Sequence, residues 1–262
     1  MKTEYESAEV DALKLQAFFE NNPKIALAFS GGVDSSYLLY AAIQHGAQVR
    51  AYYVKSAFQP QFELDDAVRL ADELNADLKI LSLDILAEPE IIANPENRCY
   101  YCKRKMFSAI WQAAQVDGFP VVMDGTNASD DAGDRPGMRA LRELSIRSPL
   151  RECGISKAEV RRLSREAGLF TWNKPAYACL ATRIPTGESI TLEKLQTTEK
   201  AENALFSLGF SNFRIRLMGG CARLQLSAEQ LPRFVEQRKA VLTALGTYYS
   251  GVLLDLEVRD EQ

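Results

Sequence analysis

The residues whose types are best suited to chemistry run from Ser30 to Ser36. Two glycines and one carboxylate, Asp34, lie there among three hydroxyl side chains. An apolar run at 25–29 precedes them and an apolar helical pattern at 38–43 follows, which predicts a strand, a tight turn and the start of a helix. Glycine lets the backbone approach a ligand closely, and the unpaired N–H groups at a helix N-terminus attract an anion, most naturally a phosphate. The stretch therefore predicts a phosphate-binding loop in which Asp34 could hold a cation or a water molecule on the phosphate.

This loop differs from two familiar phosphate-binding patterns. It contains no lysine, which a Walker A motif requires, and it lacks the Gly-x-Gly-x-x-Gly of dinucleotide-binding domains. The hexapeptide instead resembles the pyrophosphate loop (PP-loop) of the N-type ATP pyrophosphatases, reading Ser30-Gly31-Gly32-Val33-Asp34-Ser35. Those enzymes cleave ATP between its α and β phosphates and adenylate a substrate. A glycine turn that serine and aspartate merely cap is the structural alternative.

Three of the five cysteines could act together, since Cys99 and Cys102 form a Cys-x-x-Cys pair and Cys179 lies in an Ala-Cys-Leu-Ala-Thr-Arg segment. Spacing alone leaves four interpretations open. A structural zinc site would have to recruit Cys179 with Cys153 or Cys221, because no histidine is suitably placed. The others are a thioredoxin-like redox pair, two packed helix cysteines, or a 4Fe–4S cluster on three thiolates with one iron left open to bind a sulfide.

Arginines are the candidates for binding anions in the second half of the chain. Arg214 and Arg216 alternate along a predicted strand, so both side chains face the same side and could clamp a phosphate or a carboxylate. A solvated edge strand is the alternative. Five more arginines lie in one segment: Arg135, Arg139, Arg142, Arg147 and Arg151. The acidic residues of the same region could serve a metal or a ribose, or could cap turns: Asp124, Asp130, Asp131 and Asp134.

The elements that must position these residues follow from hydrophobic periodicity. Apolar runs predict strands at 49–54, 78–83 and 121–123, after the strand that enters the loop. Helical spacing predicts helices at 8–20, 62–74, 99–114, 137–144 and 156–167, and Ser156 with Glu159 fits a capping box. This alternation predicts an α/β fold, a parallel sheet with helices on both faces. Because ligands bind at the carboxyl ends of such strands, the PP-loop, the Ser56 region and Asp124–Asn127 should converge.

A change of organisation follows Gly168–Gly187, a stretch that holds Pro175 and Pro185 and shows little periodicity. Beyond it the pattern predicts a helix, two strands of a hairpin, a helix and a strand, at 191–208, 213–217, 222–226, 231–245 and 248–256. We therefore expect two domains, an ATP pyrophosphatase domain at 1–187 and a small α+β domain for substrate binding or oligomerisation at 188–262.

Composition narrows the possible functions. An apolar content of 47% and a net charge of −4 are ordinary for a soluble protein, and no apolar run is long enough to span a membrane. The sequence contains no basic tract of the kind that would predict a nucleic-acid partner. The first residues lack a signal-peptide core, so a cytoplasmic protein is expected, with its cysteines as thiols or metal ligands. The single histidine, His45, stands beside Gly46 and is expected at a helix end, so the chemistry must run without it.

Four further blocks extend the resemblance beyond the loop: Asn97–Lys103, Asp124–Gly137, Arg147–Lys157 and Trp172–Gly187. The last reads Trp-Asn-Lys-Pro-Ala-Tyr-Ala-Cys-Leu-Ala-Thr-Arg-Ile-Pro-Thr-Gly and is the most specific. With the loop and the arginine pair, these blocks resemble the LarE family, ATP-dependent sulfurtransferases that help to make the nickel-pincer cofactor of lactate racemase. The resemblance runs from about residue 25 to about residue 226.

The resemblance implies a reaction in two halves. ATP, with Mg²⁺ between its phosphates, adenylates a ring carboxylate of pyridinium-3,5-biscarboxylic acid mononucleotide. A sulfur nucleophile then displaces AMP and leaves a thiocarboxylate. Some members give up the sulfur of the cysteine that matches Cys179, whereas others carry the Cys-x-x-Cys pair and are thought to hold a 4Fe–4S cluster on Cys99, Cys102 and Cys179. Because all three cysteines are present, we expect the cluster form.

The same resemblance implies the site residues and the assembly. Catalytic roles fall to Cys179, Arg183 and Asp34, with Arg183 expected at the substrate or AMP. Residues expected to bind ATP or the substrate are Ala28, Ser30, Gly31, Gly32, Val33, Asp34, Ser35, Ser56, Gly125, Arg135, Arg214 and Arg216. LarE-like proteins assemble as homo-oligomers. Two departures stand out, Gln225 where the family usually has a glutamate, and an end soon after Glu257 where the family has a longer tail.

Three other functions stay open. The first is a tRNA-thiolating enzyme of the same superfamily, which the acidic charge and the absence of an added RNA-binding domain disfavour. The second is an amide ligase of the NAD or GMP synthetase type, which would not need Cys99, Cys102 and Cys179 together. The third is a nucleotide-binding regulatory domain without catalysis, with the cysteines as a zinc site.

Overall fold

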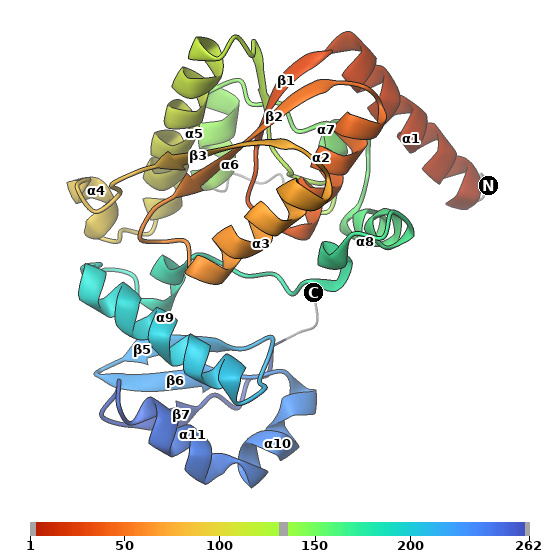
Figure 1. Cartoon of the computed structure of the whole chain (residues 1–262). Coiled ribbons are helices and arrows are strands. Elements are labelled where there is room, and N and C mark those ends of the chain that lie inside the picture. The colour runs from red at the N-terminus through yellow and green to blue at the C-terminus, as the bar shows by residue number, and fades with distance from the viewer. Residues whose placement is uncertain (1–3, 131–135, 260–262) are drawn as a thin grey trace. The chain divides into compact units, whose positions relative to one another are not determined.

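The computed structural model describes residues 4–130 and 136–259, with side chains from residue 13 onward, and these residues fold as two compact units (Figure 1). Unit 1 comprises Met1–Ser56, Gln61–Leu83 and Asn97–Lys174. Unit 2 comprises Ala57–Pro60, Asp84–Glu96 and Pro175–Gln262. Within the described part of the chain, no helix combines the length and the apolar character that crossing a membrane requires.

Unit 1 is built on a parallel sheet of four strands in the order β3-β2-β1-β4. The strands are β1 (Lys24–Ala28), β2 (Gln48–Lys55), β3 (Asp77–Ser82) and β4 (Val121–Met123). Its helices are α1 (Glu4–Asn21), α2 (Val33–Gln44), α3 (Gln61–Glu73), α5 (Arg98–Val116), α6 (Pro136–Glu143), α7 (Pro149–Glu152), α8 (Lys157–Glu166) and the 3₁₀ turn η1 (Phe170–Asn173). The predicted α/β fold with a parallel sheet is confirmed.

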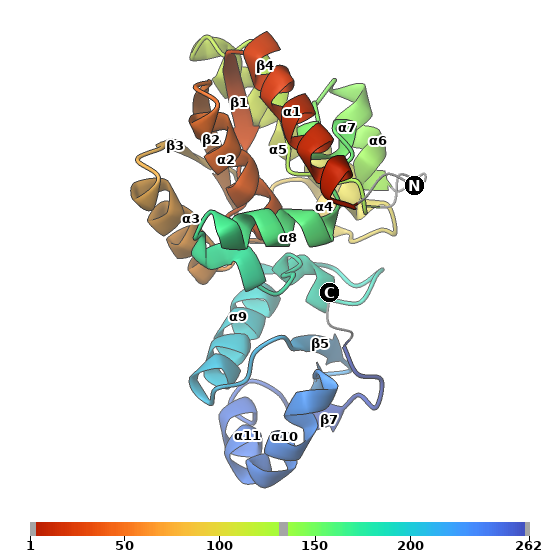
Figure 2. The ribbon, with the colours of Figure 1, turned by 90° about the vertical axis from the view of Figure 1, so that its right-hand side faces the viewer.

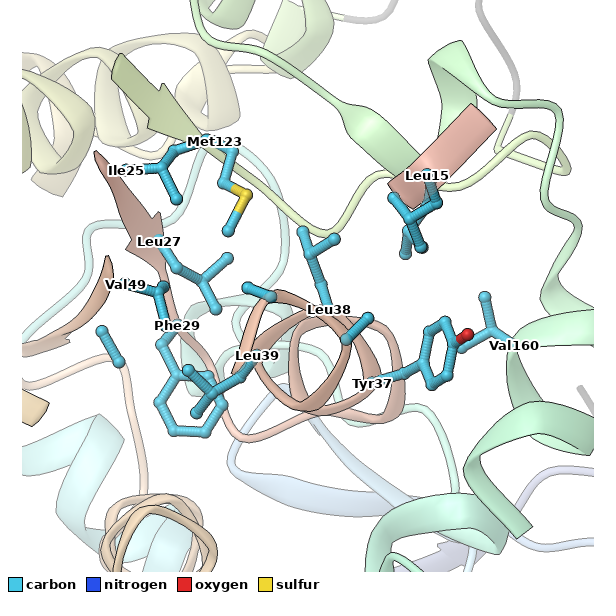
Figure 3. Close-up of a cluster of buried hydrophobic side chains, with 14 of the residues drawn as sticks. Leu15, Ile25, Leu27, Phe29, Tyr37, Leu38, Leu39, Val49, Met123 and Val160 are labelled. Atoms are coloured by element: carbon cyan, nitrogen blue, oxygen red, sulfur yellow. The ribbon is translucent and has the colours of Figure 1, made fainter. Parts of the chain in front are cut away.

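Strand β1 is buried on both faces of the sheet, and its successive side chains point to opposite sides. On one face Leu27 packs with Leu38 and Leu39 of α2 in a cluster that also takes in residues of α1 and α8 (Figure 3). On the other face Ala26 belongs to a second cluster, with Phe107 of α5. Helices α2 and α8 are neighbours on the first face (Figure 2). Strands buried on both sides explain why β1 reads as a continuous apolar run.

Unit 2 contains a second sheet in the order β5-β6-β7. Strands β5 (Arg214–Met218) and β6 (Cys221–Gln225) form the expected antiparallel hairpin, and β7 (Val252–Leu254) runs parallel to β6. The helices are α4 (Pro89–Ile92), α9 (Leu192–Ser207), α10 (Leu231–Glu236), α11 (Arg238–Leu245) and the 3₁₀ turns η2 (Leu180–Arg183) and η3 (Ala228–Gln230). One face of the sheet, with Ile215 and Leu224, is buried in a core with residues of α9 and α11.

Two predicted elements differ from the structure. The helix expected at 231–245 is two helices that meet at Gln237, whose ψ of 9° departs from helical geometry. The break lets Val241 and Leu245 of α11 enter the core, whereas α10 has no fully buried residue. The last strand is shorter than 248–256, and α4 lies where no element was predicted. His45 caps the C-terminus of α2, as expected for a helix-end residue.

Candidate active site

The loop after β1 takes the tight form that its glycines predict. Gly31 has φ of +70°, and a Cβ on it would lie 3.1 Å from the Cβ of Ala67 in α3, so a side chain there would be both strained and crowded. Ser35 closes the loop from the first turn of α2. Its Oγ donates to the Gly32 carbonyl oxygen at 3.2 Å, accepts from the Ser30 N–H at 3.3 Å and lies 3.1 Å from the Ser30 Oγ.

The N-terminus of α2 leaves donors for a ligand. Gly32 is the N-cap residue and supplies no side-chain cap, and the first backbone bond within the helix runs from the Ser36 N–H to the Gly32 carbonyl oxygen at 3.0 Å. The N–H groups of the first turn thus have no partner within the helix. Together with the positive end of the helix dipole they can bind a phosphate.

The loop after β4 packs directly against this helix start. A Cβ on Gly125 would lie 2.9 Å from the Ser35 nitrogen and 3.2 Å from the Asp34 carbonyl carbon. Because β4 and β2 flank β1 on opposite sides, this is the point at which the strand order reverses, the usual ligand position in such sheets. Ser56 follows β2 at the same edge and is buried. The predicted meeting of the PP-loop with Asp124–Asn127 is therefore present in unit 1.

Two of the acidic residues in this region hold turns together. The Asp124 carboxylate accepts hydrogen bonds from the Thr126 N–H and hydroxyl, at 3.2 and 2.6 Å, and from the Ser148 hydroxyl at 2.7 Å. Asp130 accepts from the Asn127 N–H at 2.9 Å. The turn-capping alternative accounts for both. Three residues named from this segment lie outside the described residues: Asp131, Asp134 and Arg135.

Asp34 has two partners that sequence reasoning did not assign. The Lys157 ammonium lies 2.6 Å from its Oδ2, and the Asn127 side-chain amide donates to its Oδ1 at 3.2 Å. Lys157 is the first residue of α8, whose N-cap Ser156 accepts from the Glu159 N–H at 3.3 Å, as the capping box predicts. A cation is thus fixed beside the phosphate loop, although 123 residues separate Lys157 from Asp34.

A second lysine also reaches the loop. The Lys174 ammonium donates to the Gly31 carbonyl oxygen at 3.3 Å and lies 2.7 Å from the Asp66 carboxylate in α3. Its sequence signal was weak, because the only pointer was its place in the Trp172–Gly187 block. With Lys157, it supplies the positive charge that a Walker A loop would carry within its own sequence.

The three cysteines of interest are divided between the units. Cys99 and Cys102 lie one turn apart at the start of α5, with the Arg98 guanidinium 3.9 Å from the Cys99 sulfur. Cys179, in unit 2, is the N-cap residue of η2. Cys153 is buried in the unit 1 core, and Cys221 lies on β6. Among the described residues of each unit, no three His, Cys, Asp or Glu side chains gather to hold a metal ion.

The backbone around Cys179 is anchored by a buried ion pair. Arg183 and Glu202 of α9 are 1% and 2% exposed, and the Arg183 Nε lies 2.8 Å from the Glu202 Oε1. The Arg183 Nη1 donates to the Ala178 carbonyl oxygen at 3.0 Å and to the Thr182 hydroxyl at 2.8 Å. Burial disfavours the guanidinium charge, but Glu202 outweighs it and raises the pKa of Arg183. All three guanidinium nitrogens thus have partners within unit 2.

The predicted arginine pair lies on the face of the second sheet opposite Ile215. Arg214 and Arg216 alternate on β5 and are half-buried, and the Arg216 Nη1 donates to the Gln225 side-chain oxygen at 2.8 Å. Burial and the like charges of Arg259, Arg183 and Arg216 lower the pKa of Arg214 to about 10. Sequence analysis missed Arg259, because nothing local ties this residue near the end of the chain to β5. The cluster suits a phosphate or a carboxylate ligand.

These features define unit 1 as a nucleotide-binding domain of the PP-loop class. Residues 24–94 match the family model for the queuosine biosynthesis protein QueC, which belongs to the PP-loop enzymes. Over 92% of its length the chain is 34% identical to the pyridinium-3,5-bisthiocarboxylic acid mononucleotide synthase of Lactiplantibacillus plantarum, of which the match covers 89%. The chain therefore belongs to the family of this synthase, the LarE family.

Two other relatives mark the breadth of the likeness. An uncharacterised protein of Synechocystis sp. is 38% identical over 93% of this chain and 92% of its own. The tRNA-specific 2-thiouridylase MnmA of Thermotoga neapolitana is 23% identical over 88% of this chain and 79% of its own. The likeness to this tRNA-modifying enzyme is thus weaker than the likeness to the mononucleotide synthase, although it also spans most of the chain.

Proposed function

We propose that this chain is an ATP-dependent sulfurtransferase that converts a carboxylate of pyridinium-3,5-biscarboxylic acid mononucleotide to a thiocarboxylate, in the synthesis of the nickel-pincer nucleotide. Family membership names the substrate class. The observation that carries the chemistry is the uncapped α2 N-terminus, with Asp34 paired to Lys157 beside it. This arrangement suits a substrate whose phosphates must be held while its α phosphorus is attacked.

In the activating half, the backbone of the loop binds ATP. Residues expected to contact the nucleotide are Ala28, Ser30, Gly31, Gly32, Val33, Asp34, Ser35, Ser56, Gly125 and Arg135. The N–H groups of the first turn of α2 bind the pyrophosphate that leaves, and Lys157 and Lys174 balance its charge. The substrate carboxylate attacks the α phosphorus, which forms an acyl adenylate and expels pyrophosphate.

A magnesium ion fits beside this loop, because Asp34 offers hard carboxylate oxygens at the point where phosphates would bind. When bound, it would neutralise phosphate charge. Lys157 holds the same carboxylate at 2.6 Å. We therefore propose that Lys157 orients Asp34, and that its ammonium would be available to the phosphates if Asp34 held the cation.

Arg214 and Arg216 bind the phosphate or the carboxylates of the mononucleotide. Both guanidiniums lack a carboxylate partner among the described residues, so their forks are available to an anion. Arg183 has its nitrogens engaged by Glu202, Ala178 and Thr182. We therefore assign Arg183 a positioning role, fixing the backbone that presents Cys179, in place of direct contact with substrate or AMP.

In the sulfur half, Cys99, Cys102 and Cys179 would hold a 4Fe–4S cluster. The donor set fits, because thiolates are the ligands of such clusters and Cys99 lies one helical turn from Cys102. When bound, the cluster would supply an iron site for an exogenous sulfide. The alternative donor is Cys179 itself, whose sulfur would displace AMP and then leave the chain as the thiocarboxylate, with dehydroalanine at 179.

We further propose that the protein works in the cytoplasm as a homo-oligomer and does not bind nucleic acid. The net charge of −4 and the absence of a basic tract support the last of these proposals. The homo-oligomer is proposed by resemblance to LarE-like proteins. Residues 188–262 are the part we assign to substrate binding and oligomerisation.

The test uses the full chain, purified without oxygen and supplied with ATP, Mg²⁺ and sulfide. AMP and pyrophosphate release that requires the pyridinium mononucleotide, with a thiocarboxylate product identified by mass, supports the proposal. Release that depends on tRNA instead would refute it. Iron and acid-labile sulfide near four each per chain support the cluster, whereas conversion of Cys179 to dehydroalanine after one turnover identifies the sacrificial route.

A further inference from the structure

The residues after β7 form hydrogen bonds with the end of β6 and the residue that follows it, in unit 2. The Asp255 N–H donates to the Leu224 carbonyl oxygen and the Arg259 N–H to that of Leu226, both at 2.8 Å. Between them, the Gln225 side-chain amide donates to the Glu257 carbonyl oxygen at 3.2 Å. We call 255–259 the terminal segment. Its hydrogen bonds fix the backbone from which the Arg259 side chain extends.

The Arg259 side chain is held at the beginning of β5. Its Nε donates to the Asn212 side-chain oxygen at 3.0 Å, two residues before Arg214. Burial, and after it the like charges of Arg183 and Arg216, lower the pKa of Arg259. The charge of Arg259 in turn lowers the pKa of Arg214. The terminal segment therefore brings a third half-buried guanidinium to the pair on β5.

Within the described part of the chain, the cluster has more positive than negative charge. Arg183 is paired with Glu202, and Arg223 lies 3.4 Å from the Asp255 carboxylate. Among the described residues, the guanidiniums of Arg214, Arg216 and Arg259 form no ion pair with a carboxylate. The acceptors that Arg216 and Arg259 do have are neutral amides, those of Gln225 and Asn212.

Three half-buried cations with neutral partners repel one another, so the cluster gains most from a ligand with more than one negative charge. A phosphate monoester carries between one and two negative charges near neutral pH and offers three oxygens to guanidinium forks. Gln225 orients Arg216 and leaves its charge in place, whereas a carboxylate at that position would neutralise it.

We propose that Arg259 is a specificity-determining residue, which the terminal segment adds to Arg214 and Arg216 to bind the 5′-phosphate of the substrate mononucleotide. This inference rests on the proposed function. Arg259 binds the phosphate of the substrate rather than its ring carboxylates. The enzyme should therefore lose much of its preference for the mononucleotide over the nucleoside when Arg259 is changed.

The test compares Arg259→Gln with Arg238→Gln, a matched control on an exposed arginine of α11 in the same unit. For Arg259→Gln, KM for the mononucleotide should rise about tenfold to hundredfold, the loss expected of a hydrogen bond to a charged group. KM for ATP and KM for the nucleoside should stay within about twofold, and Arg259→Lys should fall between. An unchanged KM for the mononucleotide, or an equal rise for the nucleoside, would overturn the proposal.

A binding measurement separates this inference from the proposed function. Inorganic phosphate is titrated calorimetrically into the full chain saturated with ATP, which occupies the loop of unit 1. Wild-type and Arg238→Gln proteins should bind phosphate, and Arg259→Gln should bind it at least tenfold more weakly. This result supports Arg259 as an anion ligand even if the pyridinium mononucleotide gives no turnover. Equal binding by all three proteins would refute it even if turnover is found.

Discussion

Replacing Glu202 by glutamine should strongly destabilise unit 2, because it leaves the buried Arg183 charge without its counterion. Both side chains are at most 2% exposed, and the guanidinium also holds the Ala178 carbonyl oxygen and the Thr182 hydroxyl. Removing one partner of a buried ion pair costs about 3–5 kcal/mol. At about 2–4 °C per kcal/mol for a chain of this size, the melting temperature should fall by roughly 6–20 °C.

The assay is urea unfolding followed by circular dichroism, with Glu193→Gln as the matched control. Glu193 is an exposed residue in the first turn of the same helix, so its loss should cost less than about 1 kcal/mol. A double variant, Arg183→Met with Glu202→Leu, removes both charges and should recover most of the stability. The turnover rate of this double variant should stay low, because the Ala178 carbonyl oxygen next to Cys179 no longer has its hydrogen bond from Arg183.

Two results would contradict this reasoning. If Glu202→Gln unfolds within about 1 kcal/mol of the wild-type protein, the pair is not buried and desolvated as the geometry requires. If the double variant is stable and also fully active, then Arg183 does not position Cys179. The stability and turnover measurements therefore test separate parts of the account.

Three further predictions concern unit 1. Gly125→Ala would place a Cβ 2.9 Å from a backbone nitrogen of α2, so we expect a loss of about 1–3 kcal/mol in urea unfolding, together with weaker binding in an ATP titration. Ser156→Ala removes the α8 cap and should cost about 0.5–2 kcal/mol, visible as a lower melting temperature. Hydrogen bonds, that from Lys79 foremost, lower the pKa of Asp117 from 3.8 to about 2. The stability from this carboxylate is thus present above about pH 4 and lost toward pH 2, so between these values the urea midpoint should fall more in the wild-type protein than in Asp117→Asn.

The fold of unit 1 could be predicted because its signals are local and strong. The apolar runs of the strands, the glycine turn at Gly31 and the capping box at Ser156 each act over a few residues. Rules of sheet topology then place the loops after β1 and β4 at one edge. Within this frame the positions of Asp34 and Gly125 follow directly.

The partners of these residues could not be predicted in the same way. Lys157 meets Asp34 across 123 residues, and Arg259 meets Asn212 across 47. Such contacts depend on how helices and strands pack in three dimensions, which periodicity does not record. Asp124 shows the same limit, because its sequence neighbours suit a metal ligand as well as a turn cap. The hydrogen bond from Ser148, 24 residues away, shows in the structure that this carboxylate holds the turn.

The chain passes between the two units five times, and this has a consequence for folding during synthesis. The Asn94 side chain is buried in unit 2 and donates to the Pro185 carbonyl oxygen at 2.7 Å, while the Gly187 N–H donates to the Asn94 carbonyl oxygen. Residues 84–96 leave the ribosome about 90 residues before these partners, at roughly 5–20 residues per second. For several seconds the Asn94 side chain and carbonyl oxygen therefore lack these partners in the nascent chain. For the same reason, a fragment that begins at residue 188 should not fold as unit 2 does.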